Sequence, residues 1–202
     1  MFRTIFYLST LTLIFFSLKI FSQTTKWEIE KNEKGVIVYT RKTDASPIKE
    51  FRAVTTIDAS FKTLVKILDD TENYPNWMAN CDFSKTLKEV SDGERIDYVK
   101  INIPWPLGDR DMISKYKYTI DYEKGVYKAV ITTKPDYIDE VKGFVRFKKG
   151  KGYWKLEEKG DKVKVTYQFC GDPEMSVPAW IINSFIIDGP YDTLINLKKQ
   201  VK

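Results

Sequence analysis

The fold is decided by residues 162–200, which read KVKVTYQFCGDPEMSVPAWIINSFIIDGPYDTLINLKKQ. The first part alternates apolar and polar residues from Val163 to Phe169, which is typical of a strand with one buried face. After the turn at Gly171-Asp172-Pro173 the apolar residues recur every three or four positions instead. This change of period predicts that the chain ends in a helix of about 24 residues.

The terminal helix has recognisable start and kink signals. Ser176 is placed as its N-cap, and Pro178 falls in its first turn, where the missing N–H costs nothing. Pro190 lies in the middle of the predicted helix and must remove a backbone hydrogen bond. We therefore expect one continuous helix that kinks near Gly189.

Upstream of this stretch most of the chain predicts β-hairpins. A single helix interrupts them, because Ser60 is a good N-cap and apolar residues follow it at helical spacing up to Asp69-Asp70. A twisted sheet with one dry face needs a cover, and one long helix can supply it. The prediction is an α+β fold with a curved antiparallel sheet wrapped around the terminal helix, leaving a cavity where the helix does not fill the curve. Alternating runs with turn residues between them predict strands over residues 27–31, 36–41, 48–57, 83–90, 95–103, 112–121, 126–133, 141–156 and 162–170.

The N-terminus predicts export. The chain has 202 residues, 43% of them hydrophobic and 30% charged, which suits one globular domain. Arg3 precedes an apolar run that is interrupted by Lys19 and ends before Gln23. This is the layout of a secretory signal peptide, and the apolar part is shorter than the roughly 20 residues of a membrane-spanning helix. We expect residues 1–22 to be a cleaved signal peptide and residues 23–202 to be the domain, located in the periplasm or outside the cell.

Charge and cysteine content exclude little but set expectations. The formal net charge is +5, and it becomes +3 without residues 1–22, because 31 basic residues then face 28 acidic ones. Lys and Glu interleave along the chain, as in residues 155–159, so we expect an evenly solvated surface with no basic face for nucleic acid. Cys81 and Cys170 are predicted to be separate buried thiols, although export would permit a disulfide.

Catalytic signals are weak. The chain contains no His, which excludes Ser-His and Cys-His nucleophiles and His-containing metal sites. A carboxylate or phenol could still act as acid or base, for instance Asp111 or Tyr116, but nothing distinguishes them from structural residues. We expect no catalytic residue, no metal and no cofactor.

Residues 104–111, PWPLGDRD, cannot pair as a strand because they contain two prolines. Trp105 and Leu107 on this loop either plug one end of the core or form a gate over the cavity. Arg110 could bind a polar head group together with its acidic neighbours. The pattern favours the alternative, a local Arg–carboxylate pair that fixes the loop.

Several motifs together resemble the START (steroidogenic acute regulatory protein-related lipid transfer) family. They are Tyr74-Pro75-Asn76-Trp77 followed by Cys81 and Ser84, then residues 104–112, residues 177–183, and Gly189-Pro190 running into residues 194–199. The similarity covers nearly all of the chain after the leader. It implies a helix-grip fold with a hydrophobic tunnel that encloses one lipid. The positions it places at the ligand are Ile182, Phe185, Ile186, Gly189, Thr193 and Leu197 on the helix, with Trp105 and Leu107 at the entrance beside Arg110.

The resemblance therefore predicts a non-catalytic protein that binds a lipid, fatty acid or sterol, with transport of this ligand as one use of the binding. We also expect a monomer that can touch a membrane transiently. Export argues against transfer between intracellular membranes. One alternative is a cyclase or hydrolase acting on an apolar or aromatic substrate, because aromatase/cyclases share this fold. Another is an interaction module whose core is completely filled.

Overall fold

The computed structural model describes residues 26–44, 46–103, 108–172, 181–183 and 186–201. Within these ranges no helix is long and apolar enough to cross a bilayer. The predicted signal peptide lies outside the described residues. The elements are β1 (Glu28–Glu33), β2 (Val36–Thr43), β3 (Ser46–Ile57), α1 (Phe61–Asp69), η1 (Thr71–Asn76), β4 (Cys81–Ser91), β5 (Glu94–Ile101), β6 (Arg110–Asp121), β7 (Val126–Thr133), η2 (Pro135–Tyr137), β8 (Val145–Arg146), β9 (Lys149–Lys159), β10 (Lys162–Asp172) and α3 (Asp188–Gln200).

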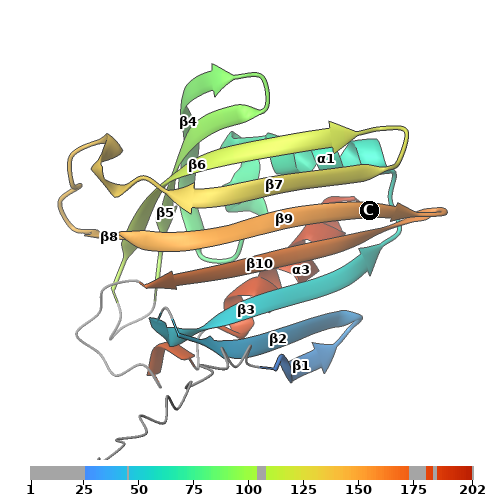
Figure 1. Cartoon of the computed structure of the whole chain (residues 1–202), viewed down its shortest axis with the longest axis horizontal. Helices are drawn as coiled ribbons and strands as arrows, with labels where there is room; N and C mark the ends of the chain where they lie inside the picture. The colour runs from blue at the N-terminus through green and yellow to red at the C-terminus, as the bar shows by residue number, and fades with distance from the viewer. Residues whose placement is uncertain (1–25, 45, 104–107, 173–180, 184–185, 202) are drawn as a thin grey trace, which may run out of the picture.

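The strands form one curved sheet in the order β1-β2-β3-β10-β9-β7-β6-β5-β4, and β8 pairs with β6 beside this path. Every pairing is antiparallel except the short β6–β8 contact. Most neighbours are sequential hairpins, while β3 and β10 join the two halves of the sheet across a long stretch of sequence. The sheet stays open, with β1 and β4 at its edges, as Figure 1 shows.

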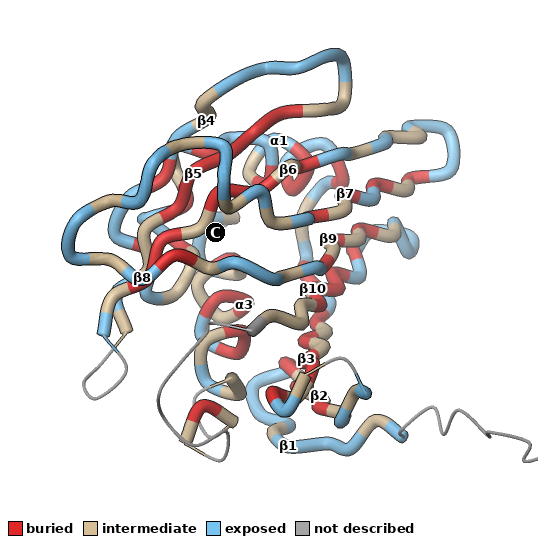
Figure 2. Tube along the Cα trace, turned by 60° about the vertical axis from the view of Figure 1, so that its left-hand side comes forward, coloured by how far each residue is buried: buried red, intermediate tan, exposed pale blue. Residues whose placement is uncertain are grey.

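Helices α1 and α3 lie on the same side of the sheet, behind the strands in the view of Figure 1. Ser60 caps α1 by accepting a hydrogen bond from the amide of Thr63 at 3.1 Å, which confirms the predicted cap. Leu194 and Leu197 of α3 are fully buried in the same core cluster as residues of β2 and β3. Figure 2 shows buried positions alternating along these strands. The predicted α+β arrangement, a curved sheet around the C-terminal helix, is confirmed.

Two predicted elements are wrong in detail. The strand expected over residues 141–156 starts only at Val145, because the chain turns at Gly143, whose φ of +91° suits a residue without a side chain, and residues 147–148 then divide it into β8 and β9. The terminal helix is not one kinked rod, because residues 186–187 form a turn and α3 starts at Asp188. Pro190 therefore lies in a first turn, where a missing N–H is tolerated. Ser176 and Pro178 lie outside the described residues.

Cys81 and Cys170 are separate thiols and form no disulfide with each other, as predicted. Only Cys81 is buried, since the side chain of Cys170 is half-exposed on the outer side of β10. Burial raises the pKa of the Cys81 thiol to about 11. At neutral pH the Cys81 thiol is therefore protonated and acts as a small apolar group.

Candidate functional site

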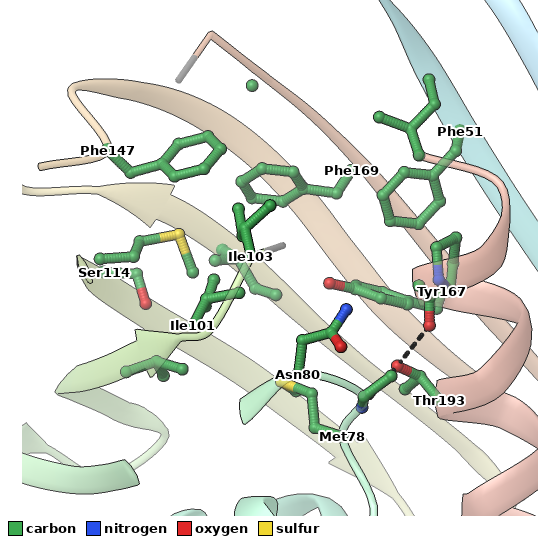
Figure 3. Close-up of a pocket in the computed structure, with 18 of the residues that line it drawn as sticks. Phe51, Met78, Asn80, Ile101, Ile103, Ser114, Phe147, Tyr167, Phe169 and Thr193 are labelled. Carbon is green, nitrogen blue, oxygen red and sulfur yellow. Dashed lines mark hydrogen bonds between the residues drawn. The ribbon is translucent and has the colours of Figure 1, made fainter. Parts of the chain in front are cut away.

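A pocket of about 410 Å³ lies between the concave side of the sheet and the C-terminal segment (Figure 3). Its size falls at the small end of the range for ligand sites, about 300–1,000 Å³. The walls are mainly aliphatic and aromatic. On the sheet side they include Phe51, Val99, Ile101, Ile103, Met112, Ile131, Phe147, Trp154, Tyr167 and Phe169, and on the opposite side Tyr74, Met78, Ala79, Ile182, Ile186, Gly189, Pro190 and Thr193.

Aromatic rings form one wall of the pocket. Figure 3 shows Phe147, Phe169 and Phe51 along the same side, and the rings of Phe147 and Phe169 meet edge to face with centroids 6.1 Å apart. The ring of Phe169 lies against strand backbone. A side chain at Gly152 would place its Cβ 2.6 Å from this ring, and one at Gly150 would do the same. These glycines are therefore required by the close approach of the ring.

The helix side is tied to the rest of the pocket by Thr193. Its hydroxyl donates to the carbonyl of Gly189 at 2.8 Å and accepts from the amide of Ala79 at 3.1 Å. Ahead of α3, the side-chain oxygen of Asn183 accepts from the amide of Lys49 at 2.9 Å. These contacts fix the C-terminal segment against both the 78–80 turn and β3.

The deep end of the pocket is polar. Asp97, Ser114 and Tyr116 line it, and Arg95 lies directly behind them. The Nε atom of Arg95 donates to both carboxylate oxygens of Asp97, at 2.9 and 3.1 Å, and Thr86 donates a further hydrogen bond at 2.9 Å. Burial raises the pKa of the Asp97 carboxyl, and the charge of Arg95 offsets this only in part.

Phenol groups surround this ion pair. The hydroxyls of Tyr116 and Tyr127 are 2.8 Å apart, and the guanidinium of Arg95 lies 4.1 Å from the centre of the Tyr116 ring. Burial raises the pKa of Tyr116 well above its usual value and that of Tyr74 to about 12. The phenols therefore stay protonated. They can exchange hydrogen bonds with a hydroxyl or carbonyl group, but they are poor bases.

The structure brings four of the predicted ligand positions to the pocket: Ile182, Ile186, Gly189 and Thr193. Leu197 instead packs into the main core, away from the pocket wall. Trp105, Leu107 and Phe185 lie outside the described residues.

Arg110 is buried, but the expected Arg–carboxylate pair is wrong. Its Nη1 atom donates to the backbone carbonyls of Gly108 and Asp109, at 3.0 and 3.2 Å. The carboxylate of Asp111 binds Arg146 instead, in a bidentate pair of 2.8 and 2.9 Å on the other side of the strand. Adjacent residues of a strand point to opposite faces, so Arg110 and Asp111 cannot easily reach one another.

Comparison with known proteins assigns the family. A family model described as START domain matches residues 14–196. The chain belongs to the START domain family. An uncharacterized protein of Pseudomonas aeruginosa is 35% identical over 177 residues, 87% of each chain. The solved structure of a STAR-related lipid transfer protein from Xanthomonas axonopodis is 32% identical, covering 87% of this chain and 98% of that one, with a TM-score of 0.79.

More distant matches differ in their described roles. Human phosphatidylcholine transfer protein is 23% identical, covering 78% of this chain and 75% of that protein. A Streptomyces aromatase/cyclase shares the fold with a TM-score of 0.52 at 10% identity, covering 75% of this chain and 90% of that one. The fold alone therefore does not separate carriers from enzymes.

Sequence reasoning missed the polar end of this START domain. Arg95 and Asp97 lie on β5 in the same alternating phase as Val99 and Ile101, which line the pocket. Two charged residues on the apolar face of a strand were a usable signal, because such residues are buried only when they are paired. Among the described residues, no cluster of acidic or Cys side chains could hold a metal ion.

Proposed function

We propose that the pocket binds one lipid or similar hydrophobic molecule, such as a fatty acid or sterol, which the protein carries without changing it chemically. The observation that carries this proposal is the combination of apolar walls with a hydrogen-bonding end. Such a site suits a molecule that has a long apolar body and one polar group. The description of the Xanthomonas relative as a lipid transfer protein supports the same assignment. A pocket of about 410 Å³ between the sheet and the C-terminal segment also argues against an interaction module with a filled core.

The hydrophobic effect is sufficient for useful affinity. Burying about 300 Å² of apolar ligand surface contributes about 7–8 kcal/mol at 25 cal/mol per Å². This corresponds to a dissociation constant in the micromolar range, before the cost of immobilising the ligand. The polar end would then favour ligands with a hydrogen-bonding group, because such a group can exchange hydrogen bonds with the hydroxyls of Ser114 and Tyr116 and a purely apolar ligand cannot.

Three features support binding without catalysis. The chain has no His. Asp111, one candidate acid or base, is neutralised by Arg146, and both side chains are 1% exposed. Tyr116, the other candidate, is held protonated by burial. The cyclase or hydrolase alternative predicts turnover, so recovery of a bound ligand as a modified product would contradict the proposal.

We also propose that the protein is exported with cleavage after Ser22, as its N-terminus predicts, and acts as a monomer outside the cytoplasm. Mass spectrometry of protein from the cell envelope or the medium tests this, because the mature chain should begin at Gln23. A full-length chain recovered only from the cytosol would contradict it. Gel filtration measures the oligomeric state.

The binding proposal is tested by filling the pocket. Ile131 lines the pocket on β7, whereas the next residue, Thr132, is exposed on the outer face of the same strand. Ile131→Trp should weaken binding of a fluorescent fatty acid or sterol probe at least tenfold, and Thr132→Trp should leave it unchanged. Mass spectrometry of a solvent extract should also detect a copurifying lipid in wild-type protein and lose it in Ile131→Trp. Equal probe binding by both variants would overturn the assignment of the pocket.

A further inference from the structure

The outer face of the sheet, opposite the pocket, is rich in lysine. In β6, β7, β9 and β10 the side chains that alternate with pocket and core residues point to this face, and the register sets Lys128 directly opposite Lys155. Fifteen side chains point outward in residues 115–119, 126–132, 151–157 and 164–170, and only one of them, Glu157, is acidic. Six of them are lysines, which we call the lysine patch: Lys115, Lys117, Lys128, Lys151, Lys155 and Lys164.

This patch contradicts the expectation of an even charge distribution. Lys and Glu interleave in the sequence, but the period of a strand places lysines from four strands on one face. The segment between β7 and β9 covers the outer face of β5 and the start of β6, where Ile138 and Val141 pack against a cluster that includes Ile113. No element covers β7, β9 or β10 in the view of Figure 1, which looks onto this face. The charges are therefore free to meet a partner.

The lysines are only partly neutralised. Lys115 and Lys117 share Glu94, at 2.7 and 3.8 Å, and Lys155 pairs with Glu157 at 2.9 Å. In the part of the chain that the structure describes, no carboxylate oxygen lies within 4 Å of the ammonium groups of Lys128 or Lys151. Both side chains are exposed, and both border a groove of about 700 Å³ on the outer face. Like charges opposite one another weaken a sheet, so the fold alone gives no reason for this arrangement.

We propose that the lysine patch docks the protein on a bilayer that contains anionic lipids. Four neighbouring strands spread the patch over about 15 Å, given a strand separation of about 4.8 Å. Lysine is a compact, hydrated point charge, which suits a diffuse negative surface, whereas tight recognition of single phosphates favours the arginine fork. Basic clusters of this size are attracted to anionic leaflets. A carrier must also meet the membrane that supplies its lipid, and this last reason rests on the proposed function.

The patch and the pocket can be tested separately. They share β9 and β10 but occupy opposite faces, since Lys151 points outward between two glycines that support the ring of Phe169. Docking should therefore be lost without loss of ligand binding in solution. A variant whose pocket is filled should lose ligand binding and still dock on vesicles.

The experiment measures sedimentation of the mature protein with vesicles of phosphatidylcholine containing about 30 mol% phosphatidylserine. The patch variant is Lys128→Gln/Lys151→Gln. Its matched control is Lys62→Gln/Lys66→Gln, which removes the same charge from exposed positions of α1 on the other side of the sheet. Each lysine near an anionic surface changes affinity about fivefold, so the patch variant should bind about 30-fold more weakly than wild type.

The control should bind like wild type, and about 0.5 M salt should abolish binding because the Debye length falls to a few ångströms. The fluorescent-probe assay should give unchanged affinity for the patch variant, while Ile131→Trp should still sediment with vesicles. Equal loss in the patch variant and the control, or equal binding to pure phosphatidylcholine, would overturn the proposal. So would failure to bind vesicles combined with patch-dependent binding to an acidic peptide or to nucleic acid, which would assign the face to that partner instead.

Discussion

Loss of the Arg146 side chain should strongly destabilise this domain. It donates to both oxygens of Asp111 and to the backbone carbonyls of Pro135, Ile138 and Asp139, at 2.6–3.0 Å. Through these contacts one buried guanidinium holds the segment between β7 and β9 against β6. The next residue in the chain is Phe147, which lines the pocket. Loosening this segment should therefore affect both stability and ligand binding.

The magnitude follows from burial. In Arg146→Met the carboxylate of Asp111 would remain 1% exposed without its partner, and breaking such a pair costs about 3–5 kcal/mol. For a domain of this length that is a fall of about 6–20 °C in Tm. The matched control is Lys124→Met, which breaks an ion pair whose lysine side chain is 78% exposed. Surface pairs contribute about 0–1 kcal/mol, so this control should unfold close to wild type.

Urea unfolding followed by tryptophan fluorescence gives both free energies. The double variant Asp111→Leu/Arg146→Met should recover part of the loss, because no buried charge is then left unpaired. A free energy of unfolding for Arg146→Met within 1 kcal/mol of Lys124→Met would refute the reasoning. It would mean that the segment is held by packing alone.

Three further outcomes are expected. Gly152→Ala should lower the free energy of unfolding in urea by about 1–3 kcal/mol, because the new Cβ would lie 2.4 Å from a carbonyl oxygen of β10. Gly189→Ala should be neutral or stabilising, because a Cβ at this position meets no atom within 4 Å. The opposite ranking of the two variants would be inconsistent with the structure. Thr193→Val should lower the free energy of unfolding by about 1–2 kcal/mol and reduce the hydrogen-exchange protection of the Ala79 amide, which donates to the Thr193 hydroxyl. Unchanged protection of this amide would argue against the hydrogen bond. Cys81, with a pKa of about 11, should resist alkylation at pH 8 in native protein and react as the pH approaches 11, so rapid labelling at pH 8 would show that it is not buried.

The sequence predicts the hairpins of this fold well because its local signals agree with one another. The alternation in β10 and the Ser60 cap of α1 are confirmed. The terminal helix was predicted too long because periodicity survives a turn: the apolar residues on both sides of residues 186–187 keep a helical spacing. Proline has two helical roles, and only the structure distinguishes a kink at Pro190 from a first turn.

The candidate site was predictable only in part. Apolar positions such as Ile182 and Ile186 follow from the family motif, and both line the pocket. The polar end depends on tertiary contacts, because it forms only where Asp97 pairs with Arg95 and where the ring of Tyr116, on the next strand, packs against the Arg95 guanidinium. The lysine patch was missed for a related reason, because the register between strands, and not the order of residues, decides which charges become neighbours.

The way Phe169 forms one wall of the pocket suggests how ligand preference could differ among related chains. The ring packs directly on the backbone of Gly150 and Gly152. The Cα hydrogens of these glycines therefore fix the position of the ring, although they lie behind it and would not contact a ligand. A single methyl group beneath it would push the ring into the pocket. Two homologues with the same pocket-lining side chains could therefore bind ligands of different width. A comparison of the pocket-lining residues alone would not explain the difference.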